Sequence, residues 1–262
     1  MSGFVLRYKA AVITGAAKGI GFATAKELLK NGVSKVLLLD IQPGLTLMQC
    51  AQLKACNSEA DVFYVQCDVS DKQQLDTALR RDALNLLGSF DILVNSAGVW
   101  ESCPTKSIDV NLIGSMHCTL LAIDLMDRQK SGTGGFIVNV SDPEAAVYTE
   151  KTFGVIGFTR TLGTELLYHK KGIKLAVISP CGARTNILKA FGGSSRPHRR
   201  MKELFEELMV KFADRQPRAI GKSIVKVITE KETGSVWLSA PDTENDAGYW
   251  IAEVKFELNK NV

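Results

Sequence analysis

The sequence predicts a doubly wound α/β fold, in which a seven-stranded parallel sheet carries helices on both faces. Apolar strand runs alternate with helical runs along the chain. The strand runs are almost continuously apolar, as expected for parallel strands that are buried on both faces. A glycine-rich turn also joins the first strand to the first helix, which is where this fold class binds nucleotides.

The strand predictions rest on short apolar runs that are bounded by turns. The first is "AAVIT" and the second is "KVLLLD", and the later runs have the same character. The seven expected strands cover residues 10–14, 35–40, 61–68, 90–98, 135–141, 173–180 and 234–240.

The expected helices lie between these strands and carry apolar residues at helical spacing. Ser70 is expected to cap the third helix, and glycines between 132 and 135 end the fourth. The helices cover residues 20–32, 43–56, 71–88, 108–130 and 148–160. No linker, composition shift or repeat divides the chain, so residues 1–262 are expected to form a single domain.

Composition excludes several classes of function. The chain has 262 residues, 45% of them hydrophobic, and a net charge of +4, without basic runs that predict nucleic-acid binding. Its six cysteines and three histidines form no CxxC pair or zinc-ligand spacing, so no metal site is expected. Reduced thiols favour a cytoplasmic location. No apolar stretch approaches the roughly 18 residues that span a bilayer, and the start of the chain does not resemble a signal peptide.

The first turn, "TGAAKGIG", indicates a dinucleotide site. Gly15, Gly19 and Gly21 allow a sharp turn and a close approach to a pyrophosphate, and the following helix offers free N–H groups to the phosphates. The alternative is a turn with only a structural role. Asp40 ends the second strand, where a carboxylate accepts hydrogen bonds from the adenosine ribose and repels a 2′-phosphate. It favours NAD over NADP, whereas the cation of Lys18 would favour a phosphate.

Five motifs in order give a more specific indication. They are "TGAAKGIG", "CDVS" (67–70), "DILVNSAG" (91–98), "VNLIG" (110–114) and "FGVIGFTR" (153–160). The chain thereby resembles the short-chain dehydrogenase/reductase family, whose members share a Rossmann fold, over nearly its whole length. Through "FDILVNSAGV", "GTGGFIVNVS" and "ETGSVWLSAP" it is similar to the 15-hydroxyprostaglandin dehydrogenase-like group and the insect-type alcohol dehydrogenases.

The resemblance implies NAD as cofactor and a small-molecule alcohol or ketone as substrate. Matching positions would line the phosphates, the adenosine, the middle of the cofactor and the nicotinamide in turn. These cofactor-binding residues are Gly15, Lys18, Gly19, Ile20 and Gly21, then Asp40 and Ile41, then Asp68 and Val69, then Asn95, Ala97 and Gly98, and finally Ala183 and Thr185.

The family also implies a Tyr that exchanges a proton with the substrate, aided by a Lys, a Ser and an Asn. Tyr148 and Asn111 match, and Lys151 and Ser141 are the remaining candidates. Lys151 lies three residues after the Tyr, whereas the family spacing is four and falls on Thr152. Asp142 occupies the position of the family's Ser, directly after Ser141.

A shortened loop accompanies these departures. Only six residue steps separate Asp142 from Tyr148, about half the number usual in the family. Two functions therefore stay open: an NAD-dependent oxidoreductase of a secondary alcohol or ketone, and a non-catalytic NAD-binding or ligand-binding protein on the same fold. The resemblance further implies a substrate lid at about 189–212, a C-terminal tail at about 241–262 and a homodimer.

Overall fold

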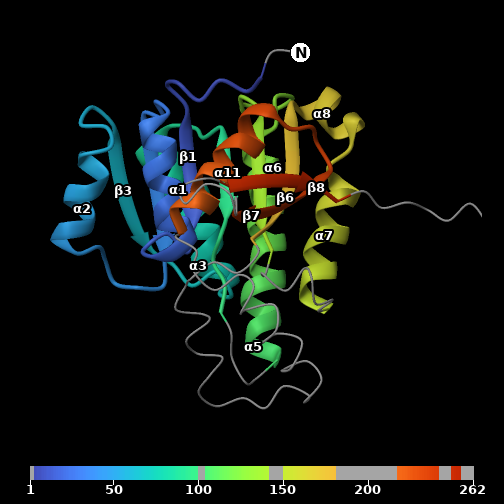
Figure 1. Cartoon of the computed structure of the whole chain (residues 1–262), viewed down its shortest axis with the longest axis horizontal. Helices are drawn as coiled ribbons and strands as arrows, with labels where there is room; N and C mark the ends of the chain where they lie inside the picture. The colour runs from blue at the N-terminus through green and yellow to red at the C-terminus, as the bar shows by residue number, and fades with distance from the viewer. Residues whose placement is uncertain (1–2, 100–103, 142–149, 181–216, 242–248, 255–262) are drawn as a thin grey trace, which may run out of the picture.

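The sheet contains seven parallel strands and an eighth antiparallel strand, in the order β3-β2-β1-β4-β5-β6-β7-β8 (Figure 1). The computed structural model describes residues 3–99, 104–141, 150–180, 217–241 and 249–254. The strands are β1 (Ala10–Thr14), β2 (Lys35–Asp40), β3 (Asp61–Gln66), β4 (Ile92–Asn95), β5 (Gly135–Val140), β6 (Ile173–Pro180), β7 (Ser235–Pro241) and β8 (Tyr249–Glu253).

All seven predicted strands are present, and the parallel pairing is confirmed. The structure also contains an eighth strand that was not predicted, β8, which pairs with β7 in the antiparallel direction at the edge of the sheet. Strand order reverses at β1, which pairs with β2 on one side and β4 on the other. In open α/β sheets, ligands bind beside such a switch point, at the carboxyl ends of the strands.

One face of the sheet is covered by α1 (Gly19–Lys30) and α11 (Pro217–Glu230), with α2 (Leu47–Lys54) beside α1. Their apolar side chains pack with Ile13, Leu38 and Val94 from the strands. Gly221 of α11 lies so close to the α1 backbone at Ala23 that a Cβ there would be 2.9 Å from it.

The opposite face of the sheet is covered by three further groups of helices. They pack on the strand side chains that point to this face, such as Val12, Leu37 and Leu93. One group is α3 (Lys72–Thr77), η1 (Ala78–Ala83) and α4 (Leu84–Leu87). The second is α5 (Pro104–Ile108), η2 (Asp109–Gly114) and α6 (Ser115–Met126), and the third is α7 (Glu150–Leu162) and α8 (Glu165–Lys171).

Two helix predictions need correction. Asp71, not Ser70, caps α3, because its Oδ1 accepts hydrogen bonds from the backbone N–H groups of Gln73 and Gln74, at 2.9 and 3.1 Å. The Ser70 hydroxyl instead donates to Asp68 Oδ1 at 2.6 Å. The expected helix at 108–130 begins earlier, at Pro104, and ends at Met126, with a π-helical segment, η2, in its middle.

The helical run Thr105–Met126 is long and apolar enough, by length and composition alone, to span a membrane. Its Cys118, Ala122 and Met126 side chains are buried against β4 and β5 in the core. This packing is that of a core helix in a globular fold. The proposed lid at 189–212 and most of the tail after residue 241 lie outside the described residues.

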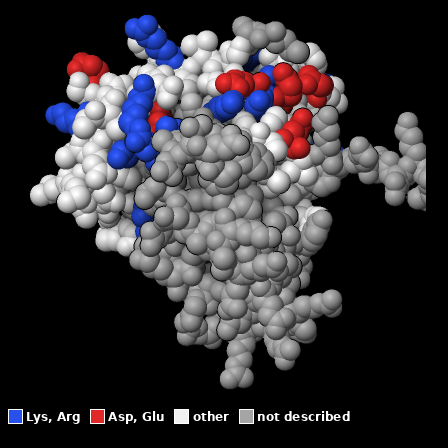
Figure 2. Space-filling model, viewed as in Figure 1, with Lys and Arg blue, Asp and Glu red and all other residues white. Residues whose placement is uncertain are grey.

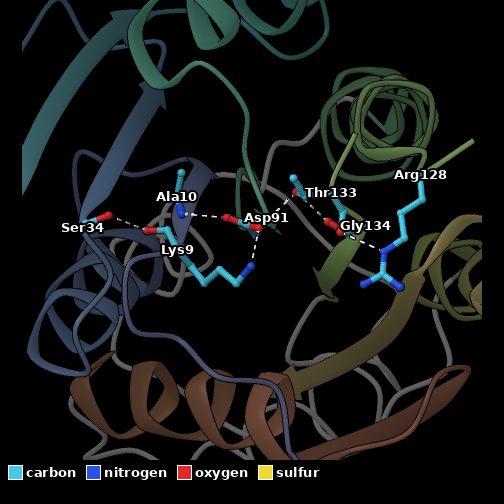
Figure 3. A network of polar contacts seen from close by, with 7 residues as sticks. All are labelled: Lys9, Ala10, Ser34, Asp91, Arg128, Thr133 and Gly134. Carbon is cyan, nitrogen blue, oxygen red and sulfur yellow. Dashed lines mark hydrogen bonds and ion pairs between the residues drawn. The ribbon is translucent and has the colours of Figure 1, made fainter. Parts of the chain in front are cut away.

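Asp91 ties the strands together at their amino ends (Figure 3). Its carboxylate accepts hydrogen bonds from Lys9 Nζ at 2.7 Å, the Ala10 backbone N–H at 3.0 Å and the Thr133 hydroxyl at 3.1 Å. The cluster therefore links β1, the start of β4 and the turn before β5. It lies at the amino edge of the sheet, opposite the glycine-rich turn.

The described part of the surface in the view of Figure 2 carries lysines and arginines mixed with acidic side chains. On the sheet face that carries η1 and α6, the Arg80 guanidinium pairs with Asp76 and Asp124, each at 3.0 Å. Such pairing agrees with the mild net charge of +4.

Candidate functional site

The glycine-rich turn has the conformation that the sequence requires. Gly15 has φ +64° and Gly19 has φ +60°, values that favour glycine. A Cβ on Gly15 would lie 2.6 Å from the Ala97 Cα, and one on Gly21 would collide with the Gly15 carbonyl oxygen. Only glycine therefore allows β1, the turn and the loop after β4 to come this close.

Lys18 is the N-cap of α1, with an extended backbone and a side chain that does not cap the helix. The Lys18 side chain is exposed, and Ile20 in the first turn is half-buried against the core. The start of α1 thus presents backbone N–H groups and a nearby cation, a combination suited to an anion.

Asp40 lies at the end of β2 with only 6% of its surface exposed. Its Oδ2 accepts a 2.8 Å hydrogen bond from the Ala17 N–H, and its Oδ1 accepts a 3.0 Å bond from the Gln42 N–H. The carboxylate is therefore fixed beside the glycine-rich turn, and each oxygen retains capacity for a further donor. Ile41, the next residue, is 55% exposed.

Two residues that sequence reasoning missed also hold this turn. Thr14 Oγ1 accepts hydrogen bonds from the backbone N–H groups of Ser96 and Ala97, at 3.1 and 3.2 Å. Gln49 of α2 donates from Nε2 to the Ala17 carbonyl oxygen. Thr14 stands directly before the turn, which is a usable sequence signal, whereas the sequence carries no local signal for a contact between residues 17 and 49.

Asp68 and Val69 follow β3 on the same edge of the sheet. Burial raises the pKa of the Asp68 carboxyl, but hydrogen bonds from Ser70 and the nearby Lys106 ammonium outweigh it, so the pKa lies below its ordinary value. Val69 is buried, and its carbonyl oxygen would lie 2.9 Å from a Cβ on Gly114. These contacts position the loop after β3 against η2.

Asn95 is 1% exposed, and its amide faces the helices rather than the turn. Its Nδ2 lies 2.7 Å from Asn139 Oδ1, 3.0 Å from Thr119 Oγ1 and 3.3 Å from the Ser115 carbonyl oxygen. This side chain is therefore used in a buried network. The backbone after it, at Ala97, packs directly against Gly15.

Asn111 is buried in η2, the π-helical segment. Its side-chain amide accepts from the Val99 N–H at 2.9 Å and donates to the Val99 carbonyl at 3.0 Å. Such π segments occur often at functional sites. Here Asn111 of the segment holds the loop after β4 at Val99, next to the carboxyl edge of the sheet.

Ser141 follows β5 and is 3% exposed, and within the described residues its Oγ has no hydrogen-bond partner. Tyr148, Asp142, Ala183 and Thr185 lie outside the described residues. Lys151 belongs to α7, but its side chain is not among those described. Of the residues expected at the adenosine half of the site, the structure places Asp40 against the glycine-rich turn, through its bond to the Ala17 N–H.

The switch point, the glycine-rich turn and the buried carboxylate after β2 define a Rossmann-fold protein. The model of the family described as "short chain dehydrogenase" matches residues 9–194 of this chain. The chain belongs to the short-chain dehydrogenase family, which places it among the oxidoreductases.

Two relatives illustrate the similarity. Alcohol dehydrogenase 2 of Ceratitis cosyra is 29% identical over 243 residues, which cover 90% of this chain and 92% of that protein. The 15-hydroxyprostaglandin dehydrogenase [NAD(+)] of Homo sapiens is 36% identical over 197 residues, 70% of this chain and 71% of that protein.

Solved structures show the same fold. Levodione reductase aligns with a TM-score of 0.70 at 22% identity, over 86% of this chain and 92% of that one. A short chain dehydrogenase/reductase from Burkholderia phymatum, solved in complex with NAD, aligns with a TM-score of 0.71 at 24% identity, over 86% and 87%.

Proposed function

We propose that this chain binds NAD(H) at the carboxyl edge of its sheet, with the adenosine ribose at Asp40 and the pyrophosphate at the glycine-rich turn. The observation that carries the proposal is the cradle at Gly15 and Gly21, where any side chain would collide with backbone. A close backbone approach of this kind suits a pyrophosphate, and Asp40 lies beside it as a fixed hydrogen-bond acceptor.

The choice of NAD over NADP rests on the same carboxylate. An ionised Asp40 would repel a 2′-phosphate, whereas the exposed Lys18 would attract one. Asp40 is buried and fixed, so its effect is screened less by solvent than that of Lys18. Parallel titrations with NADH and NADPH test this point, and tighter binding of NADPH would contradict it.

The proposed reaction is the interconversion of a secondary alcohol and a ketone, for which bound NAD supplies the hydride acceptor. Tyr148 would exchange the proton of the substrate hydroxyl, with Lys151, Ser141 and Asn111 as its helpers. A Tyr with an ordinary pKa of about 10 needs a nearby cation to act as a base near neutral pH.

The alternative is an NAD-binding protein without catalytic turnover. Three departures from the family's sequence pattern favour this alternative: Asp142 at the Ser position, Thr152 at the Lys position, and the short loop before Tyr148. An ionised Asp cannot donate a hydrogen bond to the substrate oxygen.

One experiment separates the two functions. NADH fluorescence titration is followed on the same sample by assays with a panel of alcohols and ketones. Saturable binding without turnover selects the non-catalytic protein. Turnover that is lost in Tyr148→Phe, with NADH affinity retained, selects the oxidoreductase, and absence of binding contradicts both.

A cytoplasmic homodimer completes the proposal. Ile113 and Leu120 are 37% and 47% exposed, and a spacing of seven residues puts them on one side of the helical run η2–α6. A second copy would cover such a pair. Light scattering should give twice the 28.6 kDa chain mass, and Leu120→Glu should halve it. A monomeric wild type would contradict the dimer.

A further inference from the structure

Both backbone polar groups of Ala17, on either side of its Cα, are held by side chains from distant parts of the chain. Its N–H donates to Asp40 Oδ2 at 2.8 Å, and its carbonyl oxygen accepts from Gln49 Nε2. Ala17 directly precedes Lys18, the N-cap of α1. The Ala17 carbonyl shares its peptide group with the Lys18 N–H, so the direction of the first N–H groups of α1 depends on how the Ala17–Lys18 peptide is oriented.

Gln49 is itself fixed by the start of α2. Its Oε1 accepts hydrogen bonds from the Thr46 N–H at 2.8 Å and the Thr46 hydroxyl at 2.9 Å, and Thr46 Oγ1 accepts from the Gln49 N–H at 3.3 Å. This reciprocal arrangement is a capping box. One end of the Gln49 amide thus anchors the side chain, and the other reaches the glycine-rich turn.

The segment between Asp40 and α2 is held from β3 as well. The Tyr64 hydroxyl donates to the Gln42 carbonyl oxygen at 2.6 Å, and Gln66 Nε2 donates to the Ile41 carbonyl oxygen at 3.0 Å. The segment that leads into α2 is therefore held in place by β3. Loss of the Gln49 Nε2 donor would remove the hydrogen bond that ties the Ala17 carbonyl to α2.

We propose that Gln49 is a positioning residue for the dinucleotide, which it serves by orienting the Ala17–Lys18 peptide. With the Ala17 carbonyl held by α2, the N–H groups that follow point toward the pyrophosphate position, and Asp40 stays aligned with the ribose. This role rests on the proposed NAD site and adds to it a residue that does not itself touch the cofactor.

Gln49→Glu separates this role from helix capping. A carboxylate can still accept the two bonds from Thr46, and Glu is a regular capping-box residue, but it has no donor for the Ala17 carbonyl. Gln49→Met removes the donor without adding a charge. Gln52→Glu is the matched charge control, since Gln52 lies on the same helix and its Oε1 faces Lys26 Nζ at 3.3 Å.

The test combines two measurements at 0.5 M NaCl, where the added charges are largely screened. We expect the NADH dissociation constant to rise about fivefold in Gln49→Glu and Gln49→Met, the effect of about one lost hydrogen bond, and to stay unchanged in Gln52→Glu. Hydrogen exchange of the cofactor-free protein should quicken at residues 16–21 in both Gln49 variants, with an unchanged urea midpoint for Gln49→Glu.

The outcomes separate this inference from the function on which it rests. If the wild type binds NADH and both Gln49 variants bind it equally well, the positioning role is overturned and the NAD site stands. A rise in the dissociation constant that also occurs in Gln52→Glu would assign the effect to charge and overturn it too. If the wild type does not bind NADH, the proposed function fails and this inference fails with it.

Discussion

Asn95 and Asn139 face each other across the paired strands β4 and β5, and Asn95 Nδ2 donates a 2.7 Å hydrogen bond to Asn139 Oδ1. Asn139 Nδ2 then donates to Thr159 Oγ1 at 2.8 Å, and Thr159 donates to the Val155 carbonyl oxygen of α7 at 2.7 Å. The pair therefore connects the sheet to the helix that carries the candidate Lys151. Asn95 Oδ1 has no partner within the described residues.

Asn139→Leu should lower the free energy of unfolding by about 2–4 kcal/mol, because it removes the acceptor shared by Asn95 and the Thr119 hydroxyl and the donor to Thr159 from a buried network. Urea unfolding with a constant m-value measures the loss. Thr161→Ala is the matched control on α7: its exposed hydroxyl bonds to the Gly157 carbonyl of the same helix, so the change should stay within about 0.5 kcal/mol. Equal effects of the two substitutions would contradict a special role for Asn139.

The strands could be predicted from sequence because strands buried on both faces leave continuous apolar runs. The antiparallel strand β8 could not, since its position depends on pairing with β7. Ser70 and Asp71 are adjacent, and both are good capping residues. Asp71 caps the helix because the Ser70 hydroxyl is already hydrogen-bonded to the Asp68 carboxylate.

The candidate site divides in the same way. Gly15 was predictable because a tight turn demands glycine, and the position of Asp40 at the end of β2 followed from the apolar run of that strand. The side chain of Asn95 was not predictable, since only the packing of α6 and α7 decides that it points into a polar network. Gln49 is the extreme case, because its partner Ala17 is 32 residues away in the chain.

Gly15→Ala should abolish measurable NADH binding and destabilise the fold by at least about 2 kcal/mol. The residue has φ +64°, and the new Cβ would lie 2.6 Å from the Ala97 Cα. NADH fluorescence and urea unfolding measure the two effects. Retention of wild-type affinity would show that the turn can rearrange and that the cradle is not needed.

Gly157→Ala tests the same reasoning in the opposite direction. Gly157 lies inside α7 and does not have a positive φ, and a Cβ added to it would meet none of the neighbouring described residues within 4 Å. Alanine should therefore stabilise the protein by about 0.5–1 kcal/mol through its higher helix propensity. A shift of the urea midpoint to lower concentration would contradict this expectation.

Tyr64 should titrate late. Burial, and then the nearby Asp40 carboxylate, raise its pKa from 10.0 to about 12. Because the folded state holds this proton more tightly, its contribution to stability is complete below pH 10 and is lost as pH rises toward 12. Absorbance at 295 nm should show one late step that Tyr64→Phe removes, and Asp40→Asn should move that step to lower pH. A step that Asp40→Asn does not move would exclude the carboxylate as a cause.

The cysteines should differ widely in their reactivity. Burial, and then the carboxylates of Asp68, Asp71 and Asp82, raise the pKa of Cys67 to about 12. Burial also raises the pKa of Cys118, whereas Cys50 is exposed. Because the thiolate is the nucleophile, iodoacetamide at pH 8 should label Cys50 on the order of 100-fold faster than Cys67 or Cys118 in the folded protein.

Mass spectrometry of the peptides that contain each cysteine resolves these rates separately. In 6 M guanidinium chloride the difference should disappear, because the thiols are then exposed and their pKa values return to ordinary ones. Labelling that stays slow at Cys67 after unfolding would point to a local sequence effect. Native labelling of Cys67 as fast as that of Cys50 would instead mean that the loop between β3 and α3 opens readily, since a buried thiol can react only through such an opening.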